Sequence, residues 1–209
     1  MQESFIKFAL EKKVLQFGDF TTKAGRKSPY FFNLSSFNDG DSLKILGDYY
    51  AEKIIEENIK FDLLFGPAYK GISLVGAIAI SLSNKGINKK FSSNRKEIKD
   101  HGEGGNIIGS DPIGDVMIID DVLSAGTAAR ESIELIKNTG ANPKSFIVGL
   151  DRQEKGSGEL SASNELAKDF GINVISIVNL DTLISFSENN PDHKKYLAEL
   201  RGYRENWGA

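Results

Sequence analysis

Apolar and polar positions recur along this chain with two different spacings, and the spacing changes near residue 40. The first part predicts a helix over 2–12 and then short strands over 14–17, 19–23 and 30–33. Beyond it, amphipathic stretches with helical spacing alternate with short apolar runs. They predict helices over 43–58, 71–83, 126–139 and 161–170, and strands over 61–65, 90–92, 115–120, 144–150 and 173–178. A last helical stretch, 180–207, is interrupted at Pro191.

The strands of the second part are apolar without alternation, which is typical of a parallel sheet covered by helices on both faces. Val116–Ile119 and Phe146–Val148 are clear examples. Alternating strands and helices predict an α/β fold with a central, mostly parallel sheet flanked by helices. We therefore expect one domain over 1–209, with a small β-containing flap (1–40) on a doubly wound core (41–209). Ligands bind such a sheet beyond the carboxyl ends of its strands.

Composition narrows the class of protein. The 209 residues are 40% hydrophobic and 26% charged, as in globular domains, and a net charge of -3 gives no reason to expect nucleic-acid binding. The chain has no cysteine, which excludes disulfides and fits a reducing cytoplasm, where we expect the protein to work. No secretory signal is visible. The most apolar segment, Ile72–Leu82, is shorter than the roughly 20 residues of a membrane span, so we expect a buried helix and no membrane binding.

Two adjacent carboxylates end an apolar strand. Asp120 and Asp121 follow Val116–Ile119 and precede Ser124-Ala-Gly-Thr127, where a helix begins. A solvated loop with a capping aspartate is one interpretation. However, paired like charges need compensation, and small residues at a helix N-terminus let a phosphate approach backbone N–H groups. No Gly-Lys-Ser/Thr follows this strand, which excludes a Walker P-loop. The pattern favours a sugar phosphate, whose hydroxyls would donate to the carboxylates.

Two further segments concentrate positive charge. Gly66-Pro-Ala-Tyr-Lys-Gly71 follows the strand at 61–65. It is either a turn whose lysine points into water or a loop whose amides and lysine face a diphosphate. The second segment, 94–106, contains several cations and glycines. It is either a solvated charged loop or a lid over a polyanion, and we expect a mobile loop over about 95–108.

Two positions elsewhere are weak signals when taken alone. Phe31 and Phe32 in the flap are most simply explained as core, although an extended backbone there could offer amides to a flat ring. Arg152 follows the strand at 144–150, where a planar guanidinium could bind a carboxylate through two hydrogen bonds.

Together these segments resemble the bacterial-type orotate phosphoribosyltransferases of the type I phosphoribosyltransferase family. The resemblance runs from the N-terminal helix almost to the C-terminus. It is carried by Lys27-Ser-Pro-Tyr-Phe-Phe-Asn33, Asp62-Leu-Leu-Phe-Gly-Pro-Ala-Tyr-Lys-Gly71, Asn94-Arg-Lys-Glu-Ile-Lys-Asp-His-Gly-Glu-Gly-Gly105, Asp120–Ala128 and Asp151-Arg-Gln-Glu154. One departure is Ser124, where threonine is common in the family, but the hydroxyl is retained.

The resemblance implies the type I phosphoribosyltransferase fold, with the flap as its hood. It also implies transfer of ribose 5-phosphate from phosphoribosyl diphosphate (PRPP) to orotate, which yields orotidine 5'-monophosphate and diphosphate in de novo pyrimidine (UMP) synthesis. The resemblance further implies that Mg2+ is required and that it is held mainly through substrate oxygens rather than by a protein cage. The protein is expected to be a homodimer in which part of the 95–108 loop reaches the neighbouring subunit's site.

The resemblance also assigns roles to single residues. Orotate is held by Phe31, Phe32, Ser124 and Arg152. PRPP is bound by Lys23, Tyr69, Lys70, Arg95, Lys96, Lys99, His101, Asp120, Asp121, Val122, Leu123, Ser124, Ala125, Gly126, Thr127 and Ala128. Within this set Lys99, Asp120 and Asp121 are the catalytic residues.

Two alternatives stay open at this point. A purine-type phosphoribosyltransferase would share the Asp-Asp loop, but Arg152 and the two phenylalanines disfavour it. A PRPP-sensing regulator would keep the fold without catalysis. The cations of the 95–108 loop and the lack of a basic, DNA-binding appendage disfavour that reading.

Overall fold

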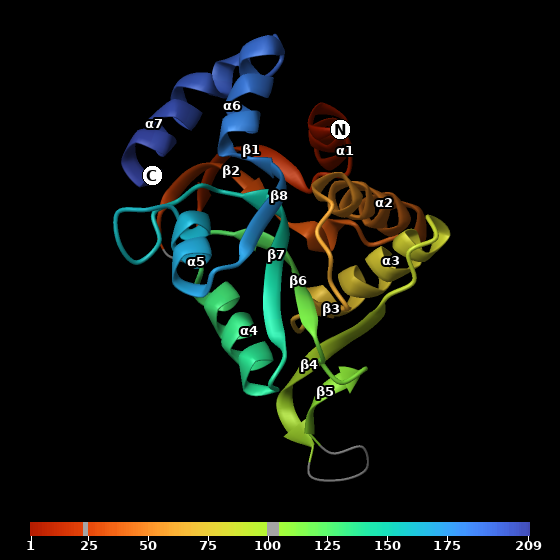
Figure 1. Cartoon of the computed structure of the whole chain (residues 1–209). Coiled ribbons are helices and arrows are strands. Elements are labelled where there is room, and N and C mark those ends of the chain that lie inside the picture. The colour runs from red at the N-terminus through yellow and green to blue at the C-terminus, as the bar shows by residue number, and fades with distance from the viewer. Residues whose placement is uncertain (23–24, 100–104) are drawn as a thin grey trace.

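A six-stranded sheet organises the described part of the protein, and a two-stranded ribbon lies above it (Figure 1). The computed structural model describes residues 1–22, 25–99 and 105–209, with only the backbone at 98, 99 and 105. Its helices are α1 (Gln2–Glu11), α2 (Gly40–Glu57), α3 (Lys70–Asn84), α4 (Thr127–Asn138), α5 (Ala162–Phe170), α6 (Leu180–Asn189) and α7 (Leu197–Trp207), with 3-10 turns at Leu34–Ser36 and Lys194–Tyr196. Its strands are β1 (Leu15–Thr21), β2 (Lys27–Phe32), β3 (Leu63–Gly66), β4 (Lys90–Lys99), β5 (Gly105–Gly109), β6 (Asp115–Leu123), β7 (Asn142–Asp151) and β8 (Asn173–Asn179).

The large sheet has the strand order β5-β4-β3-β6-β7-β8. All neighbouring strands run parallel except the β4/β5 hairpin. Helices α3, α4 and α5 connect successive parallel strands, as the alternating pattern predicts. The predicted α/β fold with a mostly parallel central sheet is confirmed. Because β3, β6 and β7 are parallel neighbours, their carboxyl ends meet at one edge.

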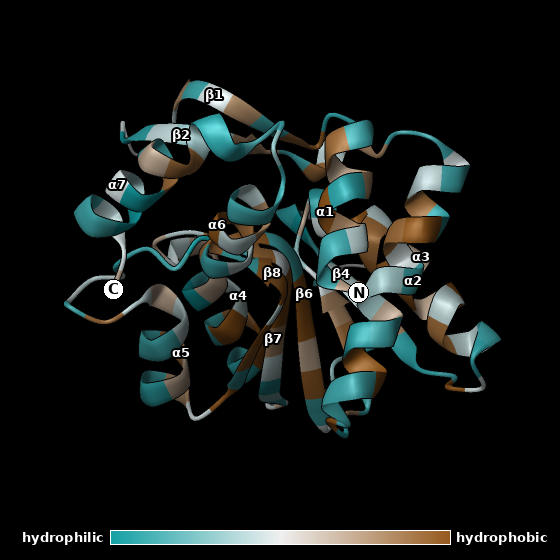
Figure 2. Cartoon of the chain, turned by 90° about the horizontal axis from the view of Figure 1, so that it is seen from above, coloured by the Kyte–Doolittle hydropathy of each residue, from teal (hydrophilic) through white to brown (hydrophobic). Residues whose placement is uncertain are grey.

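Helices cover both faces of the sheet. Met117 and Ile119 of β6 pack in one cluster with α1, α2 and α3, whereas Val116 and Ile118 pack in another with α4 and α5. Figure 2 shows the apolar strands in brown between these two groups of helices. Burial on both faces explains why Val116–Ile119 is apolar at every position.

The hood contains one ribbon of two long strands rather than three short ones. β1 replaces the predicted pieces 14–17 and 19–23 and pairs with β2, with an irregular register between Phe17 and Phe20. Gly18 lies in this irregularity at φ 149°, a conformation that glycine adopts readily. The bulge interrupts the alternation of side chains, which made a single strand look like two in the sequence.

The segment predicted as a loop over about 95–108 is largely a hairpin. β4 continues to Lys99 instead of ending near residue 92, and β5 pairs with it, placing Asn94 opposite Ile107. This prediction was wrong about local structure because β5 is an edge strand, and an edge hairpin needs no continuous apolar run. The mobility of the segment stays a prediction.

The bounds of other elements differ for local reasons. α2 begins at Gly40, not at 43, because the Asp39 carboxylate caps it by accepting a hydrogen bond from Ser42 N at 2.8 Å. β3 begins at Leu63 rather than at 61. The predicted break near Pro191 is confirmed, since α6 ends at Asn189 and α7 begins at Leu197.

Helix α3 is buried on one side only, which corrects the expectation for segment 72–82. Leu74 and Ile78 are buried, but Ile72 and Ile80 are 39% and 65% exposed. Gly76 lies between them on the same stripe, because residues four apart share a side of a helix. Among the described residues, no helix combines the length and the apolar character that a membrane crossing needs.

Phe91 of β4 is a further exposed apolar residue on this side of the sheet. It is exposed and in register with Leu64 of β3, which packs in the cluster that contains α3. Register partners of parallel strands point to the same face, so Phe91 lies on the face of the sheet that α3 covers. We call Ile72, Gly76, Ile80 and Phe91 the α3 patch.

Candidate functional site

Three chemically dense loops meet at the carboxyl edge of the sheet, after β3, β6 and β7. One cavity of about 760 Å3 opens beside the first two. Eight residues predicted to bind PRPP line it: Tyr69, Lys70, Arg95, Lys96, Asp120, Asp121, Val122 and Ala128. The fold therefore places the acidic pair around one space with Lys70, Arg95 and Lys96.

Asp121 and Lys70 make the central contact of this cavity. Lys70 Nζ donates to Asp121 Oδ2 at 2.6 Å. The other oxygen of Asp121 accepts a hydrogen bond from Val122 N at 2.9 Å. The positive charge of Lys70 thus compensates the negative charge of Asp121, as expected for two adjacent carboxylates that would otherwise repel each other.

Asp120 directly precedes Asp121 in β6. Burial, followed by the charge of Asp121, raises the pKa of Asp120 to about 7. Its Oδ1 accepts a hydrogen bond from Asp121 N at 2.8 Å, and its carbonyl oxygen accepts one from the Tyr50 hydroxyl at 2.8 Å. The pair of acids therefore carries less than two negative charges near neutral pH.

Asp120→Asn is expected to stabilise the fold at alkaline pH. An acid whose pKa is raised in the folded state contributes stability below its unfolded pKa and loses it as the pH rises through about 7. Asparagine cannot ionise, and it keeps the oxygen that accepts from Asp121 N. We expect the free energy of unfolding to exceed that of the wild type by about 1–3 kcal/mol at pH 8 and by almost nothing at pH 4. Urea denaturation at both pH values measures this, and a difference independent of pH would contradict it.

The loop after β3 is compact because of two glycines. A Cβ on Gly66 would lie 2.1 Å from the carbonyl oxygen of Gly71, so no larger residue fits at this close approach. Ala68 N donates to Asn94 Oδ1 at 2.8 Å, which connects the loop to β4. The Ala68–Tyr69 peptide bond is cis, and Lys96 Nζ lies 5.5 Å from the centre of the exposed Tyr69 ring. These contacts gather Tyr69, Lys70 and Lys96 on one wall of the cavity.

The segment after β6 offers backbone donors. Gly126, at φ 86°, precedes α4, and the first intrahelical bond runs from Arg130 N to Gly126 O. The N–H groups of the first helical turn have no partner within the helix, so they can bind a phosphate. The Leu123 side chain is buried with α4 and α5, which leaves only its backbone for a contact with PRPP.

The two phenylalanines of the hood point in opposite directions, as neighbours in a strand do. Phe32 is buried, whereas Phe31 is exposed and stacks on Phe20 at 5.4 Å between ring centres. The core interpretation is therefore right for Phe32 and wrong for Phe31.

Arg152 lies under the hood rather than in the 760 Å3 cavity. Arg152 is only 5% exposed, and its guanidinium donates hydrogen bonds to Glu154, Ser28 and Tyr203. Its backbone N donates to Leu123 O at 2.9 Å, which places it beside Ser124. Of the predicted orotate-binding residues, Phe32 lies near Gly149 of β7 and Arg152 lies beside Leu123, next to the predicted PRPP-binding residues.

The predicted cations of the hairpin are only partly described. Arg95 lines the cavity, and its Nη1 donates to Ile107 O at 3.0 Å, so it also joins the two strands of the hairpin. Lys99 is the last residue of β4, and only its backbone is described. Lys23 and His101 lie outside the described residues.

Comparison with known proteins agrees with this geometry. Residues 33–159 match the model of a phosphoribosyl transferase domain. The orotate phosphoribosyltransferases of Neisseria meningitidis serogroup C (strain 053442) and Chromobacterium violaceum are 53% and 52% identical over 208 residues, which cover 100% of this chain and 98% and 97% of theirs. The crystal structure of the Francisella tularensis orotate phosphoribosyltransferase superposes with a TM-score of 0.88 at 40% identity, covering 99% of this chain and 100% of that one.

The chain belongs to the orotate phosphoribosyltransferase family.

In this member of the orotate phosphoribosyltransferase family, several residues of the site had no role assigned from the sequence. Glu154 and Asn94 lie in the segments that carry the resemblance. Glu154 is two residues from Arg152 and Asn94 directly precedes Arg95, and this closeness in sequence could have suggested a role for both. Tyr50 of α2 and Tyr203 of α7 reach the site from distant parts of the chain. No local pattern marks either tyrosine, because each contact depends on how the helices pack.

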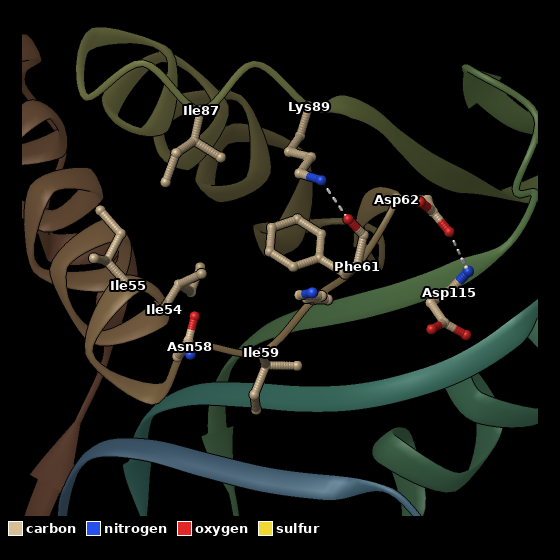
Figure 3. A pocket seen from close by; sticks show the side chains of 10 residues that line it. Ile54, Ile55, Asn58, Ile59, Phe61, Asp62, Ile87, Lys89 and Asp115 are labelled. Carbon is tan, nitrogen blue, oxygen red and sulfur yellow. Dashed lines mark hydrogen bonds between the residues drawn. The ribbon is translucent and has the colours of Figure 1, made fainter.

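A second cavity, of about 410 Å3, lies at the opposite edge of the sheet (Figure 3). The figure shows Lys89 pointing at the carbonyl oxygen of Phe61 and Asp62 pointing at the backbone N of Asp115. These hydrogen bonds measure 2.5 and 2.8 Å. They connect the starts of β3, β4 and β6, so we assign this cavity a structural role in the family fold.

Proposed function

We propose that the protein transfers ribose 5-phosphate from PRPP to orotate, yielding orotidine 5'-monophosphate and diphosphate in de novo pyrimidine synthesis. The observation that carries this is the contact of Lys70 with Asp121 in a cavity that Arg95 and Lys96 also line. The relatives named orotate phosphoribosyltransferases match the whole chain, which favours this function over a purine-type transferase or a regulator.

The charges of the cavity suit the charge separation of this reaction. As the bond from C1 of ribose to diphosphate breaks and a bond to the orotate nitrogen forms, the ring becomes positive and the leaving group negative. Asp120 and Asp121 would accept hydrogen bonds from the ribose hydroxyls and favour the cationic ring. Lys70 and Arg95 would stabilise the departing oxygens. Orotate is already an anion near neutral pH, so no strong general base is needed.

Bound PRPP would replace the ion pair between Lys70 and Asp121 with separate contacts to each residue. In the described structure each neutralises the other at 2.6 Å. A bound PRPP offers the lysine a diphosphate and offers the aspartate a ribose hydroxyl. The contact of Lys70 with Asp121 orients both groups toward the cavity in which PRPP would bind.

Mg2+ is part of the proposal. The carboxylates of Asp120 and Asp121 supply the oxygen donors that this ion prefers. The described part of the chain holds no group of three or more acidic, histidine or cysteine side chains arranged as a metal cage. Two carboxylates would leave most coordination positions of the ion to substrate oxygens and water. When bound, it would neutralise charge on the diphosphate.

A homodimer is also proposed. The α3 patch exposes apolar side chains over the helix that begins at Lys70, directly after the loop assigned to diphosphate. Burying such a patch is favourable, and a second copy seated on it would lie next to the site. That position supports the sharing of the 95–108 segment between subunits. The cytoplasmic location stays a prediction from the sequence.

One assay tests the proposed reaction. The protein is incubated with PRPP and Mg2+ and with orotate, adenine or guanine, and each base is followed by ultraviolet absorbance. We expect only orotate to be consumed, with release of diphosphate. Consumption of a purine, or of no base, would contradict the proposal.

A further inference from the structure

A buried carboxylate organises the space beneath the hood. Glu154 is 2% exposed and lies in the loop that follows β7. It accepts hydrogen bonds from Arg152 Nε at 2.5 Å, from Arg26 Nη1 at 2.5 Å and from the Tyr203 hydroxyl. A buried carboxylate with three donors has a defined orientation, because every alternative position would leave a charge unpaired.

The same contacts restrict the guanidinium of Arg152. Its Nη2 donates to Ser28 Oγ at 2.9 Å and to the Tyr203 hydroxyl at 2.6 Å. Its Cζ lies 4.3 Å from the centre of the Tyr30 ring, so the plane of the group is also held by stacking. Nη1 is the guanidinium nitrogen that has no partner among the residues described.

Another polar group of this cluster is unpaired. The Tyr30 hydroxyl is buried and has no hydrogen-bond partner among residues 1–22, 25–99 and 105–209. The cluster therefore retains the Tyr30 hydroxyl as a buried donor without a partner in the described part of the chain. Such a donor favours an acceptor supplied by a ligand.

Helix α7 contributes to this arrangement from the far end of the chain. Figure 1 shows α7 beside the β1/β2 ribbon. Besides the Tyr203 contacts, Lys155 N donates to Trp207 O at 2.8 Å, and the Arg26 guanidinium lies 4.9 Å from the Trp207 ring centre. The helix is thus connected both to the loop that carries Arg152 and to the hood.

We propose that Glu154 and Tyr203 are positioning residues for Arg152, through which helix α7 sets the affinity for the carboxylate of orotate. The inference rests on the proposed function, in which Arg152 binds that carboxylate. A guanidinium already held in one orientation loses little conformational freedom when it binds, so its partners strengthen binding without touching the substrate. Their effect should appear in the binding of orotate and not in that of PRPP.

Tyr203→Phe tests this, because it removes only the hydroxyl and keeps the ring that packs against Tyr30. We expect the KM for orotate to rise about tenfold, the range for loss of a hydrogen bond to a charged group. The kcat and the KM for PRPP should stay within about twofold of the wild type. Tyr196→Phe is the matched control: its ring stacks on Phe17 at 5.1 Å, and all three parameters should be unchanged.

Glu154→Gln provides a second test by removing the charge that both arginines share. The same rise in the KM for orotate is expected, together with a lower thermal midpoint. A wild-type KM for orotate in both variants overturns the inference, as does an equal rise for orotate and PRPP, which would indicate general distortion of the site. Either result leaves the proposed function standing if the wild type consumes orotate. Failure of the wild type to consume orotate overturns both.

Discussion

Asp121→Asn is expected to fold normally and to lose turnover by about a hundredfold or more, the usual loss when a group that stabilises transition-state charge is removed. Asparagine has the same size and keeps an oxygen to accept from Val122 N. It lacks the charge that faces Lys70 and that would favour the positive ribose ring. The kcat at saturating PRPP, orotate and Mg2+ measures the effect, and circular dichroism reports the fold.

The same strand offers a matched control. Asp115 begins β6 at the opposite edge of the sheet, and its carboxylate accepts a hydrogen bond from Asn142 Nδ2 at 2.6 Å. Asp115→Asn makes the same change of charge far from the cavity and should leave kcat within about twofold of the wild type. If Asp121→Asn also retained wild-type kcat, the assignment of Asp121 to catalysis would be wrong.

Lys99→Ala is expected to have a loss of similar size, again about a hundredfold in kcat. The resemblance gives Lys99 the departing diphosphate, and its place at the end of β4 puts it at the far end of the hairpin from the core. We expect little change in the thermal midpoint. Lys90→Ala, at the exposed start of the same strand, is the control and should retain wild-type activity. Near-normal turnover of Lys99→Ala would remove this lysine from the catalytic set.

Mixing the two inactive variants tests whether Lys99 acts across a dimer. If Lys99 of one subunit serves the acids of its neighbour, a heterodimer of Lys99→Ala with Asp121→Asn contains one site with both residues intact. We expect up to about half of the wild-type activity per such heterodimer. Purified heterodimers that show no recovery would indicate that Lys99 serves its own subunit, while leaving its catalytic role unaffected.

The position of the acidic pair of β6 could be predicted from the sequence for a local reason. Burial on both faces makes Val116–Ile119 uniformly apolar, and Asp120 and Asp121 follow near the carboxyl end of β6. Parallel strands with helical crossovers have their carboxyl ends at one edge, so the loops after β3 and β6 could be expected to meet. The contact of Lys70 with Asp121 is the outcome of that rule.

The surroundings of Arg152 could not be predicted from the order of strands and helices. Its position after β7 was sufficient to suggest an anion site, but its burial beneath the hood was not predictable. The partners that surround it come from β2, from the loop after β7 and from α7, and no spacing along the chain connects these segments. The β4/β5 hairpin and the α3 patch were missed for a related reason, since an edge or an outer surface leaves only a weak pattern of burial.

By itself, the sequence of this protein determined the order of the helices and of the parallel strands, the class of the sheet and the chemistry of the loops at one edge. Those features follow from the local spacing of apolar residues and from short runs of reactive ones. Only the tertiary structure decided that Lys70 neutralises Asp121, that burial raises the pKa of Asp120 to about 7, and that Glu154 and Tyr203 hold Arg152. Each of these depends on burial and on contacts between distant segments, which exist only after the strands have paired and the helices have packed.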